Sequence, residues 1–112
     1  MTLTEQKSGE VSVLDLNGKI DMEGTEMLDG KITEILDRGE RSVLLGFAGV
    51  NYINSAGLCA LIVAGKRLTR AGGKMALAEV SEPIQKILKI SGLSSFFAVH
   101  PTKEAALASF TQ

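Results

Sequence analysis

The sequence has little of several residue types that particular functions require. It holds one cysteine, Cys59, among 112 residues, so it cannot form an internal disulfide, which fits a reducing compartment. Its formal net charge of −1 lacks the basic excess that a nucleic-acid surface needs. No apolar run approaches the ~20 residues that span a bilayer, and residues 1–10 carry charges instead of a signal-peptide core. We therefore expect a cytoplasmic domain, residues 1–112, without direct nucleic-acid contact or membrane insertion.

Residues that bind metals or nucleotides are equally scarce. The only histidine, His100, lies far along the chain from Cys59, and one His with one Cys cannot complete a zinc shell. A phosphate-binding loop needs the pattern G-x-x-x-x-G-K-[ST]. The two Gly-Lys pairs, at 65–66 and 73–74, each lack the first glycine and the final Ser or Thr. The sequence thus predicts no metal, no cofactor and no autonomous nucleotide hydrolysis.

What the chain does contain is a series of strand and helix patterns in an aliphatic background. Trp is absent and aromatic residues make up 4% of the chain, so the core must consist mainly of Leu, Ile, Val and Ala. Alternating or short apolar runs predict strands at Thr2–Gln6, Val11–Leu16, Val43–Leu45, Lys74–Val80 and Phe96–Val99. Helical spacing of apolar residues predicts helices over 26–37, from Ser55 to a glycine C-cap at Ala71-Gly72-Gly73, around Pro83, and over Thr102–Phe110.

This alternation of strands and helices predicts the α/β class. Helices between strands favour parallel crossovers, whereas two initial strands joined through Ser8-Gly9 would pair as a hairpin. We expect a mixed β-sheet of four to five strands flanked by about four helices. A chain of this length fits a single domain.

One enzyme hypothesis arises because Ser55 stands at a predicted strand-to-helix turn. Either Glu79 or Glu82, and then His100, follows it in the chain order of the α/β-hydrolase triad. The nucleophile elbow G-x-S-x-G, however, has Ile53 in place of its first glycine. The chain is also short for the usual sheet plus a substrate pocket. We therefore do not expect an enzyme.

The helix start at Ser55 has two other interpretations. A serine at or next to an N-cap can accept hydrogen bonds from free backbone N–H groups, so a plain cap is one of them. The second is phosphorylation, because a helix N-terminus favours anions and the small neighbours Ala56 and Gly57 leave the hydroxyl open to a kinase. A phosphate there would add roughly two negative charges and disturb the fit to a protein partner.

Three stretches of the chain resemble the motifs of one family, in order and in spacing. They are Leu16-Asn-Gly-Lys-Ile-Asp21, Tyr52-Ile-Asn-Ser-Ala-Gly-Leu58, and the segment from Gly72-Gly73-Lys74 to Ile90-Ser-Gly-Leu93. The chain resembles, over nearly its whole length, the STAS domains of the anti-sigma factor antagonist type. This resemblance implies a mixed sheet flanked by helices. It also implies that Ser55 accepts phosphate from a serine kinase that is itself an anti-sigma factor, with Asp21 near the partner surface.

The resemblance further implies a partner switch. The unphosphorylated antagonist would bind the anti-sigma factor and release the sigma factor, and the phosphorylated form would not. The implied partner-binding residues are Asp21, Asn54, Ser55, Ala56, Gly57 and Leu58.

Two positions depart from the family pattern. Asn54 replaces the usual Asp before the phosphoacceptor, and Gly46 lies near the end of a strand that usually carries an Asp there. The neutral Asn54 removes a charge that could orient a kinase, yet it also reduces repulsion against a phosphate. It keeps open an alternative function, a constitutive STAS interaction module in a regulatory or transport complex without a phosphorylation switch.

Overall fold

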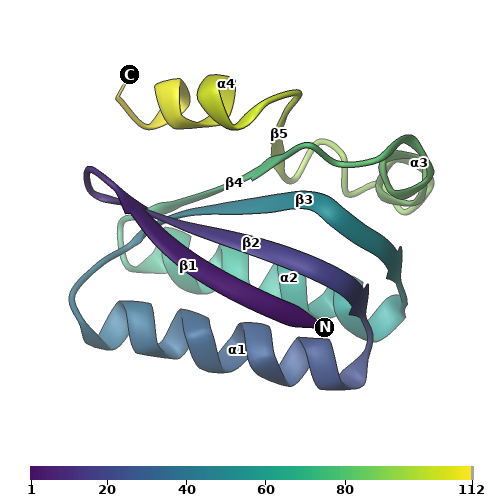
Figure 1. Ribbon diagram of the computed structural model, residues 1–112, viewed down its shortest axis with the longest axis horizontal. Helices are drawn as coiled ribbons and strands as arrows, with labels where there is room; N and C mark the ends of the chain where they lie inside the picture. Colours follow the sequence, from purple (N-terminus) through teal and green to yellow (C-terminus); the bar gives the residue numbers. More distant parts are fainter. Residues whose placement is uncertain (112) are drawn as a thin grey trace.

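The computed structural model describes residues 1–111, which form five strands, four α-helices and a short 3-10 helix (Figure 1). The strands are β1 (Thr2–Ser8), β2 (Val11–Ile20), β3 (Ser42–Ile53), β4 (Lys74–Ala78) and β5 (Ala98–His100). The helices are α1 (Met22–Asp37), α2 (Ser55–Arg70), α3 (Glu82–Ile90), α4 (Lys103–Ala108) and the 3-10 turn η1 (Ser109–Thr111). The predicted order of strands and helices is confirmed.

The strands form one sheet in the order β1-β2-β3-β4-β5. Strands β1 and β2 are an antiparallel hairpin whose turn contains Gly9 at φ +61°, and the remaining neighbours pair in parallel. The sheet is therefore mixed, and the predicted α/β class is confirmed. Helices α1 and α2 lie under one face, α4 lies over the other, and α3 lies past the end of β4, beside the last part of β3 (Figure 1).

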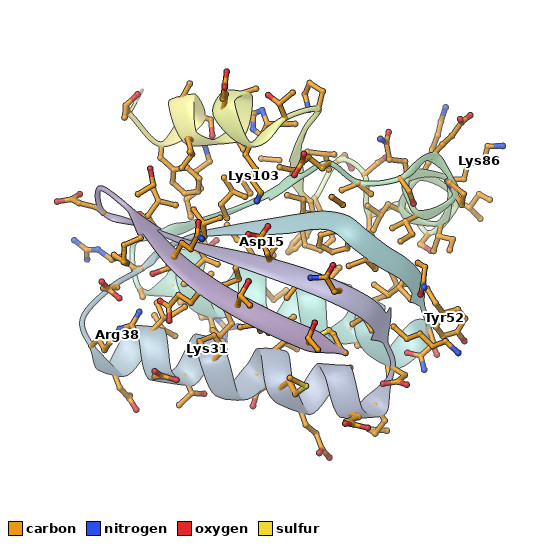
Figure 2. All side chains as sticks on the ribbon, in the orientation of Figure 1. Asp15, Lys31, Arg38, Tyr52, Lys86 and Lys103 are labelled. Atoms are coloured by element: carbon orange, nitrogen blue, oxygen red, sulfur yellow. The ribbon has the colours of Figure 1, made fainter. Side chains whose placement is uncertain are left out.

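The two faces of the sheet have separate cores. The larger core joins α1, α2 and α3 to the sheet, and its fully buried side chains include Leu28, Leu61 and Leu88. The smaller core lies under α4, whose buried Ala106 contacts a patch of small and aliphatic residues from β2, β3 and β4. Above this patch Lys103 of α4 forms an ion pair with Asp15 of β2 at 2.5 Å (Figure 2). Asp15 is the register partner of Gly46, so a carboxylate from the neighbouring strand occupies the space above that glycine.

Several element boundaries differ from the prediction. Helix α1 begins at Met22, four residues before the predicted start, because Asp21 caps it. Strand β3 runs for 12 residues, well beyond the apolar Val43–Leu45, and carries glycines at 46 and 49. Strand β5 begins only at Ala98, since Phe96 belongs to the preceding turn.

The glycine C-cap predicted for α2 is confirmed. Gly72 adopts φ +84°, and the N–H of Gly73 donates to the carbonyl of Leu68 at 2.8 Å. This is the Schellman pattern, which returns the chain sharply into β4. It ends α2 at Arg70, and β4 begins at Lys74.

Candidate partner-binding site

Two helices start side by side at the carboxyl edge of the sheet. Strands β2 and β3 run parallel and end at the register partners Ile20 and Ile53. The N–H of Asn54 donates to the carbonyl of Ile20 at 3.3 Å, which ties the two strand ends together. Because α1 and α2 follow immediately, their N-termini point to the same edge of the molecule.

Each helix is capped by the residue directly after its strand. The Asp21 carboxylate accepts from the N–H of Gly24 at 3.1 Å, and the Asn54 side-chain oxygen accepts from the N–H of Gly57 at 2.9 Å. Ser55 is therefore the first residue inside α2 and does not serve as its cap. The cap interpretation of Ser55 is wrong by one residue, because Asn and Ser are equally good caps and the chain uses the earlier one. Within residues 1–111 the exposed Ser55 hydroxyl makes no hydrogen bond, so its oxygen is not occupied by a contact within the domain.

A buried glycine holds α2 close to the sheet. A Cβ on Gly57 would lie 2.5 Å from the carbonyl oxygen of Ile20 and 2.7 Å from Cγ1 of Ile53. Gly57 therefore has a packing role and offers no surface to a partner, in contrast to the expectation from sequence. Leu58 is half-buried and packs against the larger core. The remaining predicted residues, Asp21, Asn54, Ser55 and Ala56, do lie together at the edge and are at least partly accessible.

This arrangement of elements matches a known family. The family model of the STAS domain matches residues 3–106. The chain belongs to the STAS domain family. It is 33% identical over 110 residues to BtrV of Bordetella bronchiseptica, which bears the name of an anti-sigma factor antagonist; the match covers 98% of this chain and 95% of BtrV.

Solved structures share the fold of this STAS domain. A crystal structure described as an anti-sigma factor antagonist of Thermotoga maritima superposes with a TM-score of 0.92 at 20% identity, covering 98% of this chain and 95% of that one. The phosphorylated form of the Bacillus cell fate determinant SpoIIAA superposes with a TM-score of 0.75 at 21% identity, covering 96% and 98% of the two chains. The predicted family and the predicted fold are thus confirmed.

The two helix starts of this STAS domain differ in charge. The first turn of α1 carries Glu23 beside the Asp21 cap, whereas the first turn of α2 has no acidic residue and its cap is neutral. The N–H groups of a helix N-terminus carry a partial positive charge, which at α2 has no carboxylate of its own helix to offset it. The edge around Ser55 is therefore electrostatically suited to an added anion.

Two exposed apolar side chains at this edge escaped the sequence analysis. Met22 is 64% exposed and Tyr52 is 48% exposed, and Figure 2 shows Tyr52 at the end of β3. Exposed aromatic and Met side chains are enriched at protein interfaces. A signal was present in the sequence: Ile20-Asp-Met-Glu-Gly24 and Ile53-Asn-Ser-Ala-Gly57 share the pattern Ile-(Asp/Asn)-x-x-Gly, which puts Met22 in the same helical position as Ser55.

The hydrolase hypothesis requires Ser55 and His100 to lie within hydrogen-bond reach of each other. Across residues 1–111 no hydrogen bond links Ser55 to His100, whose Nε2 atom is buried without a partner. A triad needs the nucleophile and the base within hydrogen-bond reach. The described part of the chain also has no cluster of three metal-binding side chains, and none of its helices could span a membrane.

Proposed function

We propose that this STAS domain is an anti-sigma factor antagonist controlled by phosphorylation of Ser55. It binds a kinase-type anti-sigma factor through the edge formed by the starts of α1 and α2, and binding releases the sigma factor. The names of its relatives support the class of partner. The observation that carries the switch is the position of Ser55, exposed and unbonded at the first residue of a helix without acidic residues in its first turn.

The unphosphorylated surface is suited to a protein contact. Ser55 and Asn54 are neutral, and the exposed Met22 and Tyr52 beside them provide apolar area that a partner would cover. Tyr is among the residue types that provide most of the binding free energy at interfaces, and Met is enriched in interface cores. Gly57 contributes indirectly, because it allows α2 to lie against β2 and so fixes the height of Ser55 at the surface.

Phosphorylation would change this surface more than the fold. The Ser55 oxygen would attack the γ-phosphorus of ATP, lose its proton, and release ADP. The new group adds roughly two negative charges where the partner met a neutral hydroxyl. The partial positive charge of the α2 N-terminus stabilises a phosphate there, so we expect α2 to remain folded.

The switch is tested by binding and by mass spectrometry. The purified protein is incubated with an anti-sigma kinase from the same organism and ATP, and the phosphorylated residue is mapped. Calorimetry then compares wild type, Ser55→Ala and Ser55→Asp. We expect Ser55→Asp to bind at least about tenfold more weakly, equivalent to roughly 1.4 kcal/mol, and Ser55→Ala to bind about as tightly as wild type.

A matched control separates a local effect from a change in net charge. Gln6→Glu adds one negative charge on the exposed face of β1, at the opposite end of the sheet, and should leave affinity unchanged. If phosphate appears elsewhere, or if Ser55→Asp binds as tightly as wild type, the switch is refuted. A stable complex that ignores both Ser55 variants would instead identify a constitutive interaction module.

A further inference from the structure

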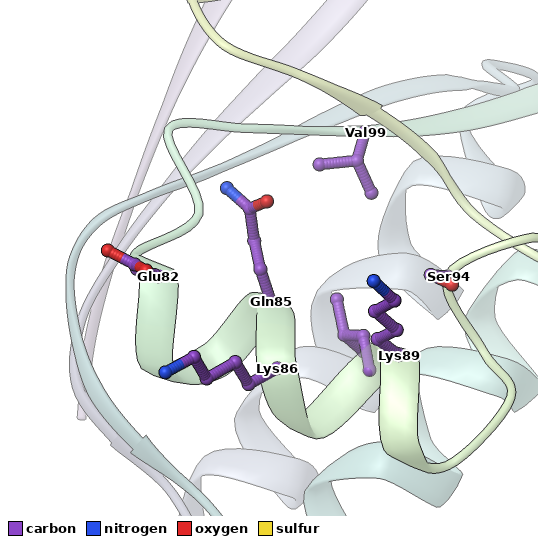
Figure 3. Close-up of a pocket in the computed structure, with 7 residues that line it drawn as sticks. Glu82, Gln85, Lys86, Lys89, Ser94 and Val99 are labelled. Carbon is purple, nitrogen blue, oxygen red and sulfur yellow. The ribbon is translucent and has the colours of Figure 1, made fainter.

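A groove separates α3 from the edge strand β5. It forms an open cavity of about 250 Å³ lined by Glu82, Gln85, Lys86, Leu88, Lys89, Ser94 and Val99 (Figure 3). None of the residues at the Ser55 edge lines it. The cavity lies below the ~300–1,000 Å³ typical of sites for drug-sized ligands, so it suits a single side chain of a partner better than a whole cofactor.

The floor of the groove is apolar. Leu88 is 1% exposed and belongs to the larger core, and Val99 of β5 is half-buried beside it. Val99 pairs in register with the buried Leu77 of β4, so its side chain points to the α3 side of the sheet. An aliphatic side chain placed over this floor would remove its own apolar surface and the accessible part of Val99 from water.

The rim of the groove has a free positive charge. The side chain of Lys89 reaches into the hollow toward Val99 (Figure 3), and within residues 1–111 neither Lys89 nor Lys86 forms an ion pair. Glu82 is the one carboxylate among the lining residues. The lining therefore carries two positive charges against one negative, which complements an acidic ligand.

One wall of the groove is an open strand edge. Strand β5 ends the sheet, and across residues 1–111 no further strand pairs with its outer side. The carbonyl of His100 accepts from the N–H of Glu79 at 3.2 Å, so His100 directs its backbone groups to β4. Neighbouring residues of a strand direct theirs to opposite edges, which leaves the N–H and C=O of Val99 facing outward. An extended segment could pair with them as an added strand.

We propose that this groove is a second docking site, which takes an extended acidic segment of a partner protein. One aliphatic side chain of the segment enters the cavity over Leu88 and Val99, its backbone pairs with Val99, and a neighbouring carboxylate meets Lys89. The site is separate from the Ser55 edge, so it operates in either state of Ser55.

A defined probe peptide tests this site. The peptide acetyl-Glu-Asp-Leu-Asp-Glu-amide is titrated into the ¹⁵N-labelled full chain, and backbone NMR shifts are followed. We expect shifts concentrated at Gln85, Lys89 and Val99, and at least about tenfold weaker binding to Lys89→Glu. Replacing the central Leu of the peptide by Ala, or its acids by Lys, should weaken binding by a similar factor.

The control variant is Lys66→Glu, which reverses an exposed charge on α2 outside the groove and should bind the peptide as wild type does. The spectra themselves show whether each variant is folded. The proposal is overturned if no groove residue shifts at roughly 2 mM peptide, or if Lys89→Glu and Lys66→Glu weaken binding equally. Equal binding of the lysine peptide would overturn it as well.

Discussion

The starts of α1 and α2 are two versions of the same structure with different chemistry at one position. Both follow neighbouring parallel strands, both use a side-chain cap that accepts from the N–H three residues later, and both have a buried glycine at that third residue. They differ at the first helical residue, which is Met22 in α1 and Ser55 in α2, and in the acidic residues that only α1 carries. The fold thus constrains the cap and the glycine and leaves the first helical residue free for function.

The largest change in the free energy of unfolding should come from substituting the two buried glycines, Gly24 and Gly57. The change should be larger at Gly57. A Cβ at Gly57 meets the carbonyl oxygen of Ile20 at 2.5 Å, whereas a Cβ at Gly24 meets that of Lys19 at 2.9 Å and otherwise the flexible side chain of Met1. We expect Gly57→Ala to lower the free energy of unfolding by about 3 kcal/mol and Gly24→Ala by about 1 kcal/mol. Urea denaturation measures both.

A third glycine supplies the control for that pair. Gly30 lies in α1 with open space where a Cβ would be. Gly30→Ala should therefore raise the free energy of unfolding by roughly 0.5–1 kcal/mol, the gain in helix propensity. Equal losses for Gly24→Ala and Gly57→Ala would contradict the closer packing of α2.

Substituting the two capping residues should cost equal amounts of stability, in contrast to the two glycines. Asp21→Ala and Asn54→Ala each remove one hydrogen bond to a first-turn N–H, so each should cost about 1 kcal/mol of stability. Ser55→Ala is the matched control, because Ser55 does not cap the helix, and it should change stability little. A loss for Ser55→Ala as large as that for Asn54→Ala would return the capping role to the serine.

A negative charge introduced at the first helical residue should change stability differently in α1 and α2. Ser55→Asp places a carboxylate in a first turn that has none, and we expect it to stabilise the fold by about 0.5 kcal/mol. Met22→Asp places one between Asp21 and Glu23, where repulsion offsets the helix dipole, so little or no gain is expected. Thermal unfolding at low salt shows the difference, and added salt should reduce it.

The smallest expected effect on stability comes from the ion pairs that link the C-terminal end of α1 to β1. Arg38 donates to Glu5, which lowers the pKa of that carboxyl below its ordinary 4.5, and Lys7 and Arg38 lower the pKa of Glu40 in the same way. A lowered pKa in the folded state gives stability that is present above about pH 4.5 and is lost as the pH falls through the folded value.

The resulting pH dependence can be measured directly. Wild type should lose more stability than Glu5→Gln between about pH 5 and about pH 3, by a small amount because these groups are near solvent. Within residues 1–111 Arg70, at the end of α2, forms no ion pair, so Arg70→Gln should leave the pH dependence unchanged. Identical acid profiles for wild type and Glu5→Gln would show that the network does not act in solution.

The sequence predicted those helices and strands whose signals lie in residues close together in the chain. Apolar spacing and the Gly72-Gly73 pair predicted the order of elements and the end of α2, because both depend on nearby residues. It did not predict the start of α1, since Met22, Glu23 and Gly24 carry no apolar periodicity and only the Asp21 cap marks the boundary. Nor did it separate Asn54 from Ser55 as the cap, because both residue types serve equally well there.

The groove between α3 and β5 could not be read from the sequence at all. Its lining residues come from a helix, the turn after it and an edge strand, and only the packing of these elements brings Leu88 and Val99 together. The exposed Tyr52 was hidden for a related reason. A register irregularity between Gly18 and Lys19 breaks the simple alternation of inward and outward residues along β2 and β3.

The separation of the cap at Asn54 from the hydroxyl at Ser55 has an evolutionary consequence. Position 55 does not hold the helix, so a mutation there leaves a stable protein whatever it does to regulation. The proposed switch could therefore be lost, or acquired again, through a single substitution at position 55 without passing through an unfolded intermediate. A switched and a constitutive form of this domain would then differ by one codon, whereas both would still need Gly57 beneath the start of α2.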